Sequence, residues 1–298
     1  MEDRAVLFRP LVHRLKPTRI LRWQDGQAAF VSDCLAPEEP LEVRVDSRPV
    51  SITMRTPGHD EELAVGFLVA EGMLRQRADV RAVRPYPRNV AGNVVDVLLA
   101  QEVSVDFSKL TRHVLASSSC GLCGKASIAS VRSQFPMVKS KVSITKDVLL
   151  GLTNKMHAEQ ATFASTGGLH AAALFTAEGE LLLLREDVGR HNAVDKILGR
   201  TFLDGLHPLD RHVLLVSGRT SFEILQKALA AGIAVVAAVS APSSLAVQFA
   251  RANGQTLVGF LREGRFNVYA GEKRIRFPIA THLGGNRKVK APATRRRQ

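Results

Sequence analysis

Hydrophobic positions in the first hundred residues form short runs that alternate with polar or turn-forming residues. The strand-like runs occupy residues 28–31, 41–45, 50–54 and 94–99. Between them, residues 60–74 place apolar side chains at roughly helical spacing, and the acidic residues Asp60, Glu61 and Glu62 suit the positive end of a helix dipole. This pattern predicts a small α+β N-terminal domain over residues 23–110.

Residues 111–285 show a different pattern, in which continuous apolar runs alternate with amphipathic stretches. The apolar runs lie at 171–175, 181–184, 213–216, 234–239 and 256–261, and the helical stretches at 190–199, 221–231 and 243–252. Such alternation is typical of an α/β sheet covered by helices. The turn Ala177-Glu178-Gly179 between the first two runs predicts a hairpin, so we expect a mixed sheet.

Two junctions between a strand and a helix in this half carry hydroxyl side chains and free backbone N–H groups, at residues 217–221 and 240–243. Helix N-termini bind anions, and open α/β sheets bind ligands at the carboxyl ends of their strands. Arg219 in the first junction adds a positive charge. The pair predicts a phosphate-binding edge, and the alternative is that the serines only cap helices.

Composition and charge exclude several classes of protein. Hydrophobic residues make up 45% and charged residues 23%, as in a globular protein. We find neither a membrane-spanning apolar run nor a signal-peptide core, so we expect a cytoplasmic protein. The net charge is +13, of which residues 1–22 carry +4 and residues 286–298 carry +6. We therefore expect a basic N-terminal extension over 1–22, a basic disordered tail over 286–298, and no nucleic-acid module.

Three cysteines are present, and two of them form the motif Cys120-Gly121-Leu122-Cys123. Cys34 lies in an apolar stretch and is expected to be an inert packed thiol. Serines at 117–119 and Gly124 flank the motif, which predicts a mobile loop. Lys125 and a helix expected at 126–131 would lower the pKa of a nearby thiol and make it reactive.

Four interpretations of this motif compete. A structural zinc site needs two more ligands, and a structural disulfide is disfavoured in the cytoplasm. A zinc deaminase is suggested by His157-Ala158-Glu159, but its motif order is reversed here and Ser119 stands where that class has proline. The fourth interpretation is thiol chemistry, in which a thiolate takes up a sulfane sulfur as a persulfide and passes it on.

Six segments together resemble the FdhD-type formate dehydrogenase accessory sulfurtransferases (FdhD/NarQ family). They are SSCGLCG (118–124), TGGLH (166–170), EDVGRHNAVDK (186–196), SGR (217–219), SAPS (240–243) and GFLREGR (259–265). The likeness runs from about residue 44 to residue 269. It implies a homodimer, and a three-layer C-terminal domain similar to the cytidine deaminase fold, as a sulfurtransferase domain over 111–285.

The resemblance also implies a reaction and its site. The family carries persulfide sulfur from a cysteine desulfurase to the molybdenum bis(molybdopterin guanine dinucleotide) cofactor, which the formate dehydrogenase catalytic subunit needs. Cys120 then corresponds to the persulfide cysteine and Cys123 to its catalytic partner, with no metal of the protein's own. The cofactor-binding residues correspond to Phe260, Leu261, Arg262, Glu263, Gly264 and Arg265.

The sequence leaves open the roles of two histidines and one alternative function for the protein. His191 follows Glu186-Asp187 and could act as an acid or base, although Asp187 or Asn192 can equally hydrogen-bond the helix start. His170 presents the same choice between catalysis and structure. The alternative function is a non-catalytic chaperone that binds and shields the molybdenum cofactor.

Overall fold

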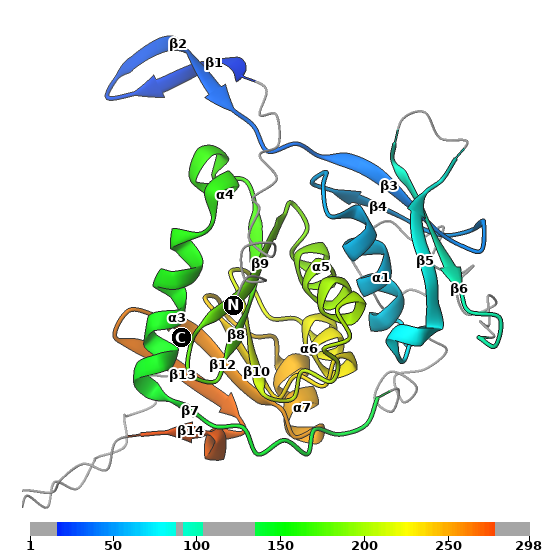
Figure 1. Cartoon of the computed structure of the whole chain (residues 1–298). Coiled ribbons are helices and arrows are strands. Elements are labelled where there is room, and N and C mark those ends of the chain that lie inside the picture. Colours follow the sequence, from blue (N-terminus) through cyan, green and yellow to red (C-terminus); the bar gives the residue numbers. More distant parts are fainter. Residues whose placement is uncertain (1–16, 88–91, 104–134, 278–298) are drawn as a thin grey trace, which may run out of the picture.

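The computed structural model describes residues 17–87, 92–103 and 135–277 (Figure 1). Cys120, Cys123, the expected helix at 126–131 and the basic tail lie outside the described residues. The N-terminal elements are β1 (Pro17–Gln24), β2 (Gln27–Cys34), β3 (Glu39–Val45), β4 (Arg48–Arg55), α1 (Asp60–Ala70), a 3₁₀ helix (Arg77–Asp79), β5 (Val80–Pro85) and β6 (Val94–Leu99).

The N-terminal part contains a four-stranded sheet in the order β4-β3-β6-β5, with α1 packed on one face. β3 is antiparallel to β4 and parallel to β6, and alternate residues such as Leu41 and Val43 are buried beneath Leu63 and Leu68 of α1. The expected strands and helix are confirmed, and β5 was not predicted. The helix ends before residue 74 because Gly72 adopts a left-handed conformation (φ 74°).

The C-terminal part is built on a six-stranded mixed sheet in the order β13-β12-β11-β10-β8-β9. Its elements are β7 (Ile144–Thr145), α3 (Lys146–Ala158), α4 (Ala161–Thr166), β8 (His170–Thr176), β9 (Leu181–Asp187), α5 (Arg190–Leu203), β10 (His212–Val216), α6 (Phe222–Ala230), β11 (Val235–Ala238), α7 (Ser244–Ala252), β12 (Thr256–Arg262), β13 (Arg265–Ala270), a 3₁₀ helix (Glu272–Arg274) and β14 (Ile275–Arg276). β10, β11 and β12 are parallel, whereas β8, β9 and β13 pair antiparallel with their neighbours. The predicted mixed sheet and the β8–β9 hairpin are confirmed.

Helices cover both faces of this sheet, which gives three layers (Figure 1). Leu214 and Val216 of β10 pack with α5, α6 and α7, while Val213 and Leu215 point to the opposite face and pack with α3. The alternation explains why these strands are continuously apolar, since each is buried on both sides. The described fold is therefore mixed α/β, as expected.

The two parts are joined by an unusually close contact between α1 and α5. A Cβ atom added at Gly66 of α1 would lie 1.8 Å from the backbone oxygen of Asp195, and one added at Gly199 of α5 would lie 1.8 Å from the backbone oxygen of Glu62. Only glycine allows the two backbones to approach this closely. Both helices are thus fixed against each other at two reciprocal points.

The β1–β2 hairpin stands away from both sheets and touches the body near α4 (Figure 1). Asp25 and Gly26 both have positive φ, which is the conformation of a tight hairpin turn. β1 begins at Pro17, so the last residues of the N-terminal extension predicted over 1–22 form part of a strand. The boundary predicted near residue 110 lies outside the described residues.

None of the helices in the described part of the chain is long and apolar enough to cross a membrane.

Candidate functional site

The carboxyl ends of β10, β11 and β12 lie at one edge of the C-terminal sheet, because these strands are parallel. β8 runs antiparallel to β10, so its first residue, His170, reaches the same edge, where it pairs with Asp187 at the end of β9. Both predicted junctions, 217–221 and 240–243, follow these strand ends. The edge is where an open α/β sheet is expected to hold a ligand.

Hydrogen bonds tie the loops of this edge into one surface. The Ser217 hydroxyl accepts a bond from Ala171 N (2.9 Å), and Ser243 N donates to Thr220 O (3.0 Å). Phe260 N donates to Ser240 O (3.1 Å), which attaches the end of β12 to the second junction. The backbone of the edge is therefore preorganised from β8 to β12.

Capping explains only one of the two junctions. The Ser243 hydroxyl accepts a bond from Ala246 N and caps α7. Ser221 makes no side-chain cap for α6. The Thr220 hydroxyl is completely buried and has no hydrogen-bond partner among the described residues. A buried, unsatisfied hydroxyl of this kind is uncommon and marks the first junction as a place for a ligand or water.

A positive corner surrounds Gly218 in the first junction. A Cβ atom added at Gly218 would lie 3.3 Å from His170 Nδ1 and 3.5 Å from Arg190 Cδ, so glycine leaves room for both side chains. The Arg190 Nε atom is buried and unpartnered among the described residues, and the exposed Arg219 is close enough to affect His170. Two guanidinium groups in one corner favour an anionic ligand.

Both histidines near this corner are electrically neutral at neutral pH. Burial, together with the charges of Arg190 and Arg219, lowers the pKa of His170. Burial and the nearby Lys227 and Arg190 lower the pKa of His191 to about 4. The positive charge of the corner at neutral pH therefore comes from arginine.

His191 and Asp187 have structural partners. The His191 Nε2 atom lies 3.3 Å from the Ser221 hydroxyl. The fully buried Asp187 accepts bonds from Gly189 N (2.8 Å) and the Asn192 side chain (3.0 Å), and pairs with Lys196 Nζ at 2.7 Å. As predicted for the structural alternative, Asp187 and Asn192 organise the start of α5.

The same network reaches the N-terminal sheet. Thr56 N donates to the Asp187 carboxylate (3.2 Å), Lys196 Nζ donates to Thr56 O (2.9 Å), and Asn192 donates to Met54 O (2.8 Å). Every charged group in this buried cluster is paired. The network therefore fixes the end of β4 against the loop that presents Arg190.

Residues 260–265 comprise the last three residues of β12, the two-residue turn Glu263-Gly264 and the first residue of β13. Phe260 has φ 52° and is 39% exposed, so an aromatic side chain is held outward in a conformation that non-glycine residues rarely adopt. A register shift between Gly259 and Arg262 accompanies it, as in a β-bulge. Such strain often accompanies a functional position.

The remaining residues of this turn differ in what they can contribute. Leu261 is fully buried in the core below the sheet, so only its backbone is available to a ligand. Arg262, Glu263 and Arg265 are exposed, and Gly264 has φ 75° with open space around it. Leu215, Ala237 and Val258 lie side by side on β10, β11 and β12, so β12 runs about 10 Å from β10, and Arg262 lies four residues further along β12 than Val258.

The predicted cysteine pair lies outside the described residues, so the structure does not place it relative to this edge. Cys34 is a free, partly exposed thiol at the end of β2, which corrects the expectation that it is packed. His157 and Glu159 lie exposed at the C-terminal end of α3. Among the described residues, none of the His, Cys, Asp and Glu side chains form a group that could hold a metal ion.

The sequence predicted the two junctions and the arginine turn, but it missed Arg190 as a site residue. Arg190 begins α5 in a segment whose histidine and carboxylates are the more conspicuous candidates in the sequence. Arg190 is recognised as a site residue only in the folded structure, where β8 and β10 bring His170 and Gly218 beside it. These two residues are 20 and 28 positions away from Arg190 in the chain.

These features describe an α/β protein with a preorganised, arginine-rich strand edge. The model of the FdhD/NarQ family matches residues 36–276, and the chain belongs to this family. It is 51% identical over 274 residues to the sulfur carrier protein FdhD of Streptomyces coelicolor, covering 89% of this chain and 97% of that protein. It is also 41% identical over 266 residues to the protein of the same name from Sulfurisphaera tokodaii, covering 88% of this chain and 99% of the relative.

A solved structure has the same fold. The crystal structure from Desulfotalea psychrophila, described as that of a formate dehydrogenase accessory protein, matches with a TM-score of 0.71. The match covers 88% of this chain and 99% of that chain, at 22% sequence identity.

Proposed function

We propose that this protein is a sulfurtransferase that carries persulfide sulfur from a cysteine desulfurase to the molybdenum bis(molybdopterin guanine dinucleotide) cofactor of a formate dehydrogenase. The observation that carries the proposal is its 51% identity, over nearly its whole length, to proteins named sulfur carrier protein FdhD. The motif Cys120-Gly121-Leu122-Cys123 supplies the thiols that such a carrier needs.

The uptake of sulfur requires one reactive thiolate. The Cys120 thiolate attacks the terminal sulfur of the desulfurase persulfide, the sulfur–sulfur bond of the donor breaks, and the donor cysteine leaves as a thiolate. Cys120 then holds the persulfide. This exchange needs no external oxidant or reductant because one sulfur–sulfur bond replaces another.

The release of sulfur explains a second thiol two residues away. Attack of the Cys123 thiolate on the Cys120 sulfur forms a disulfide and expels the terminal sulfur as hydrosulfide, which the cofactor accepts. Two equivalents of a cellular thiol then reduce the disulfide and restore both cysteines. Cys123 is therefore proposed as the resolving residue.

The arginine-rich edge is suited to the cofactor, which is the substrate of the reaction. The cofactor carries guanine nucleotides and pyrophosphate groups, and guanidinium groups pair with phosphate through two parallel hydrogen bonds. Arg190 and Arg219 line one end of the edge, while Arg262 ends β12 and Arg265 begins β13. The outward ring of Phe260 could stack on a guanine or pterin ring.

The double variant Arg219→Ala and Arg262→Ala is expected to bind guanosine diphosphate at least about tenfold more weakly than the wild type. Each lost charge-assisted hydrogen bond contributes about 1.5–3 kcal/mol. Isothermal titration calorimetry at low salt measures the change. The control is Arg81→Ala, because Arg81 is exposed on β5 of the other sheet. Equal affinities of the double variant and the wild type would place the nucleotide elsewhere.

The cellular role is tested by complementation. A bacterial strain that lacks its own FdhD/NarQ protein should regain formate dehydrogenase activity when it produces this chain. If the chain is produced at normal levels and no activity returns, the proposed client is wrong.

We also propose that the protein is a homodimer. This is checked by measuring the mass of the purified protein in solution.

A further inference from the structure

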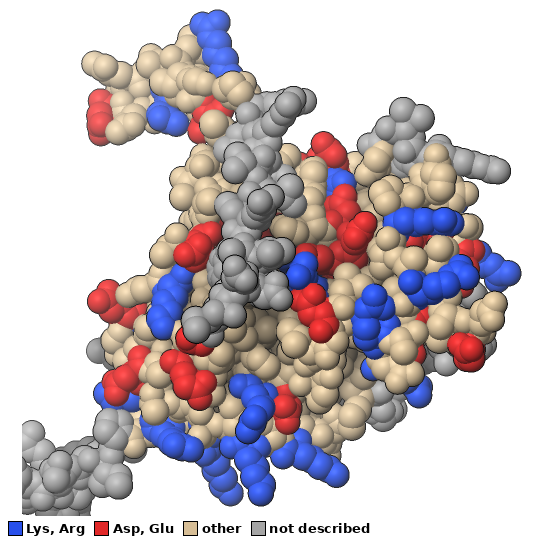
Figure 2. All heavy atoms as spheres, viewed as in Figure 1, with Lys and Arg blue, Asp and Glu red and all other residues tan. Residues whose placement is uncertain are grey.

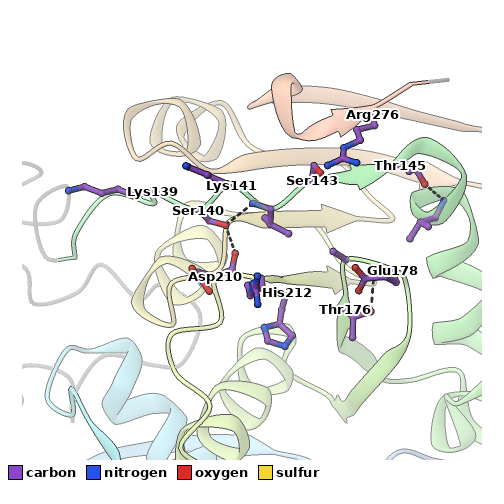
Figure 3. A pocket seen from close by; sticks show the side chains of 14 residues that line it. Lys139, Ser140, Lys141, Ser143, Thr145, Thr176, Glu178, Asp210, His212 and Arg276 are labelled. Atoms are coloured by element: carbon purple, nitrogen blue, oxygen red, sulfur yellow. Dashed lines mark hydrogen bonds between the residues drawn. The ribbon is translucent and has the colours of Figure 1, made fainter. Parts of the chain in front are cut away.

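A concave surface lies at the end of the sheet opposite the arginine-rich edge. Its volume is about 1070 Å³, and it is lined by the segment before β7, the β8–β9 turn, the start of β10 and the end of β14. Figure 3 shows Lys139 and Lys141 on one side, Arg276 above, and Glu178 and His212 below. β10 begins at this pocket and ends at the arginine-rich edge, so the length of the strand separates the two surfaces.

The pocket carries an excess of positive charge. Four basic side chains line it, Lys139, Lys141, Arg211 and Arg276, against the two acids Glu178 and Asp210. Within the described ranges, none of the four cations forms an ion pair, whereas the buried cations Arg185 and Lys196 pair with Glu62 and Asp187. Figure 2 shows Lys and Arg side chains gathered along the lower margin, where β7 and β14 lie in Figure 1.

The lysine-bearing wall is held in place by side-chain hydrogen bonds. The Ser140 hydroxyl donates to Asp210 O (2.5 Å) and accepts from Val142 N (3.0 Å), so it links this wall to the turn before β10. The Arg274 guanidinium donates to Ser140 O through two nitrogens, at 3.3 and 3.2 Å. Lys139 and Lys141 therefore project from a fixed backbone on either side of Ser140.

The rest of the lining favours a peptide over a nucleic acid or a free phosphate. Val142 and Val148 give the pocket an apolar part, while Ser143 and Thr145 supply hydroxyls that can bond a peptide backbone. Its lining contains no Phe, Tyr or Trp, so the stacking of bases would depend on the His212 ring and the arginine guanidinium planes alone. Its volume is also at the upper end for small-molecule sites.

We propose that this pocket is a docking site for an acidic segment of a partner protein. Such a segment would pair with the four unpaired cations and place its apolar side chains against Val142 and Val148. A partner held here leaves the opposite edge of the sheet open. The basic sequence at 286–298 follows β14 in the chain and adds charge of the same sign.

The test uses the full chain and a fluorescein-labelled peptide of about eight glutamates, followed by fluorescence anisotropy at low salt. The double variant Lys141→Glu and Arg276→Glu is expected to bind at least about tenfold more weakly than the wild type. The control Arg81→Glu also reverses a positive charge, but on the N-terminal sheet. Its affinity for the peptide should stay within about twofold of the wild-type value. Both altered side chains of the double variant are exposed, and circular dichroism verifies that the variant is folded.

Two results would overturn the proposal. Unchanged peptide affinity in the double variant would show that the pocket is not the binding surface, since that variant retains the basic sequence at 286–298. A single-stranded oligonucleotide of equal length that binds more tightly than the peptide, and loses binding in the same variant, would assign the pocket to nucleic acid. The assay contains no desulfurase or cofactor, so its outcome is independent of the proposed sulfur transfer.

Discussion

Replacing Cys120 with alanine is expected to reduce sulfur transfer to the cofactor by about 100-fold or more, because the variant lacks the nucleophile that takes up sulfur. Transfer is measured with a desulfurase and ³⁵S-labelled cysteine, followed by the appearance of label in the cofactor. Cys123→Ala should still take up sulfur on Cys120 but release it slowly, since the resolving thiol is missing.

Cys34→Ala is the matched control for this experiment. Cys34 is a free and partly exposed thiol that lies on β2, outside the motif. Its loss should leave transfer unchanged. Wild-type transfer by both Cys120→Ala and Cys123→Ala would mean that the protein only binds and shields the cofactor.

Gly199→Ala is expected to lower the free energy of unfolding by about 3 kcal/mol or more, a large part of the stability of an ordinary domain. The added methyl group would lie 1.8 Å from the backbone oxygen of Glu62 and 2.7 Å from Gly66 N, so α1 and α5 would have to separate. That separation would also disturb the ion pair between Glu62 and Arg185. Urea unfolding followed by circular dichroism measures the loss.

The matched control is Gly151→Ala, which is expected to stabilise the protein where Gly199→Ala destabilises it. Gly151 also lies within a helix, α3, but no atom lies within 4 Å of an added Cβ. Alanine there should raise stability by about 0.5–1 kcal/mol through helix propensity alone. Equal stability of the wild type and Gly199→Ala would contradict the close packing of α1 on α5.

The buried strands and amphipathic helices of the C-terminal sheet were predictable because burial on both faces leaves long apolar runs. β7 and β14 were not predictable, because each has only two residues and they pair with each other across a long separation in the sequence. The β1–β2 hairpin could have been found from Asp25-Gly26, a dipeptide typical of tight hairpin turns, but the surrounding arginines suggested an extension.

The candidate site was predictable where it depends on local sequence. Hydroxyls after a strand, and arginines on either side of the β12–β13 turn, indicate anion binding without any knowledge of the fold. The unpartnered Arg190 Nε, the buried Thr220 hydroxyl and the strained Phe260 could not be predicted, because each depends on how separate loops meet. The burial of Leu261 is likewise a consequence of a register shift at the end of β12.

The most direct test of the account is to locate sulfur on the protein itself. The full chain is incubated with a cysteine desulfurase and cysteine, the free thiols are blocked, and the peptides are examined by mass spectrometry. We expect one additional sulfur atom on Cys120 and none on Cys34. Absence of added sulfur on Cys120, or equal labelling of Cys34, would contradict it.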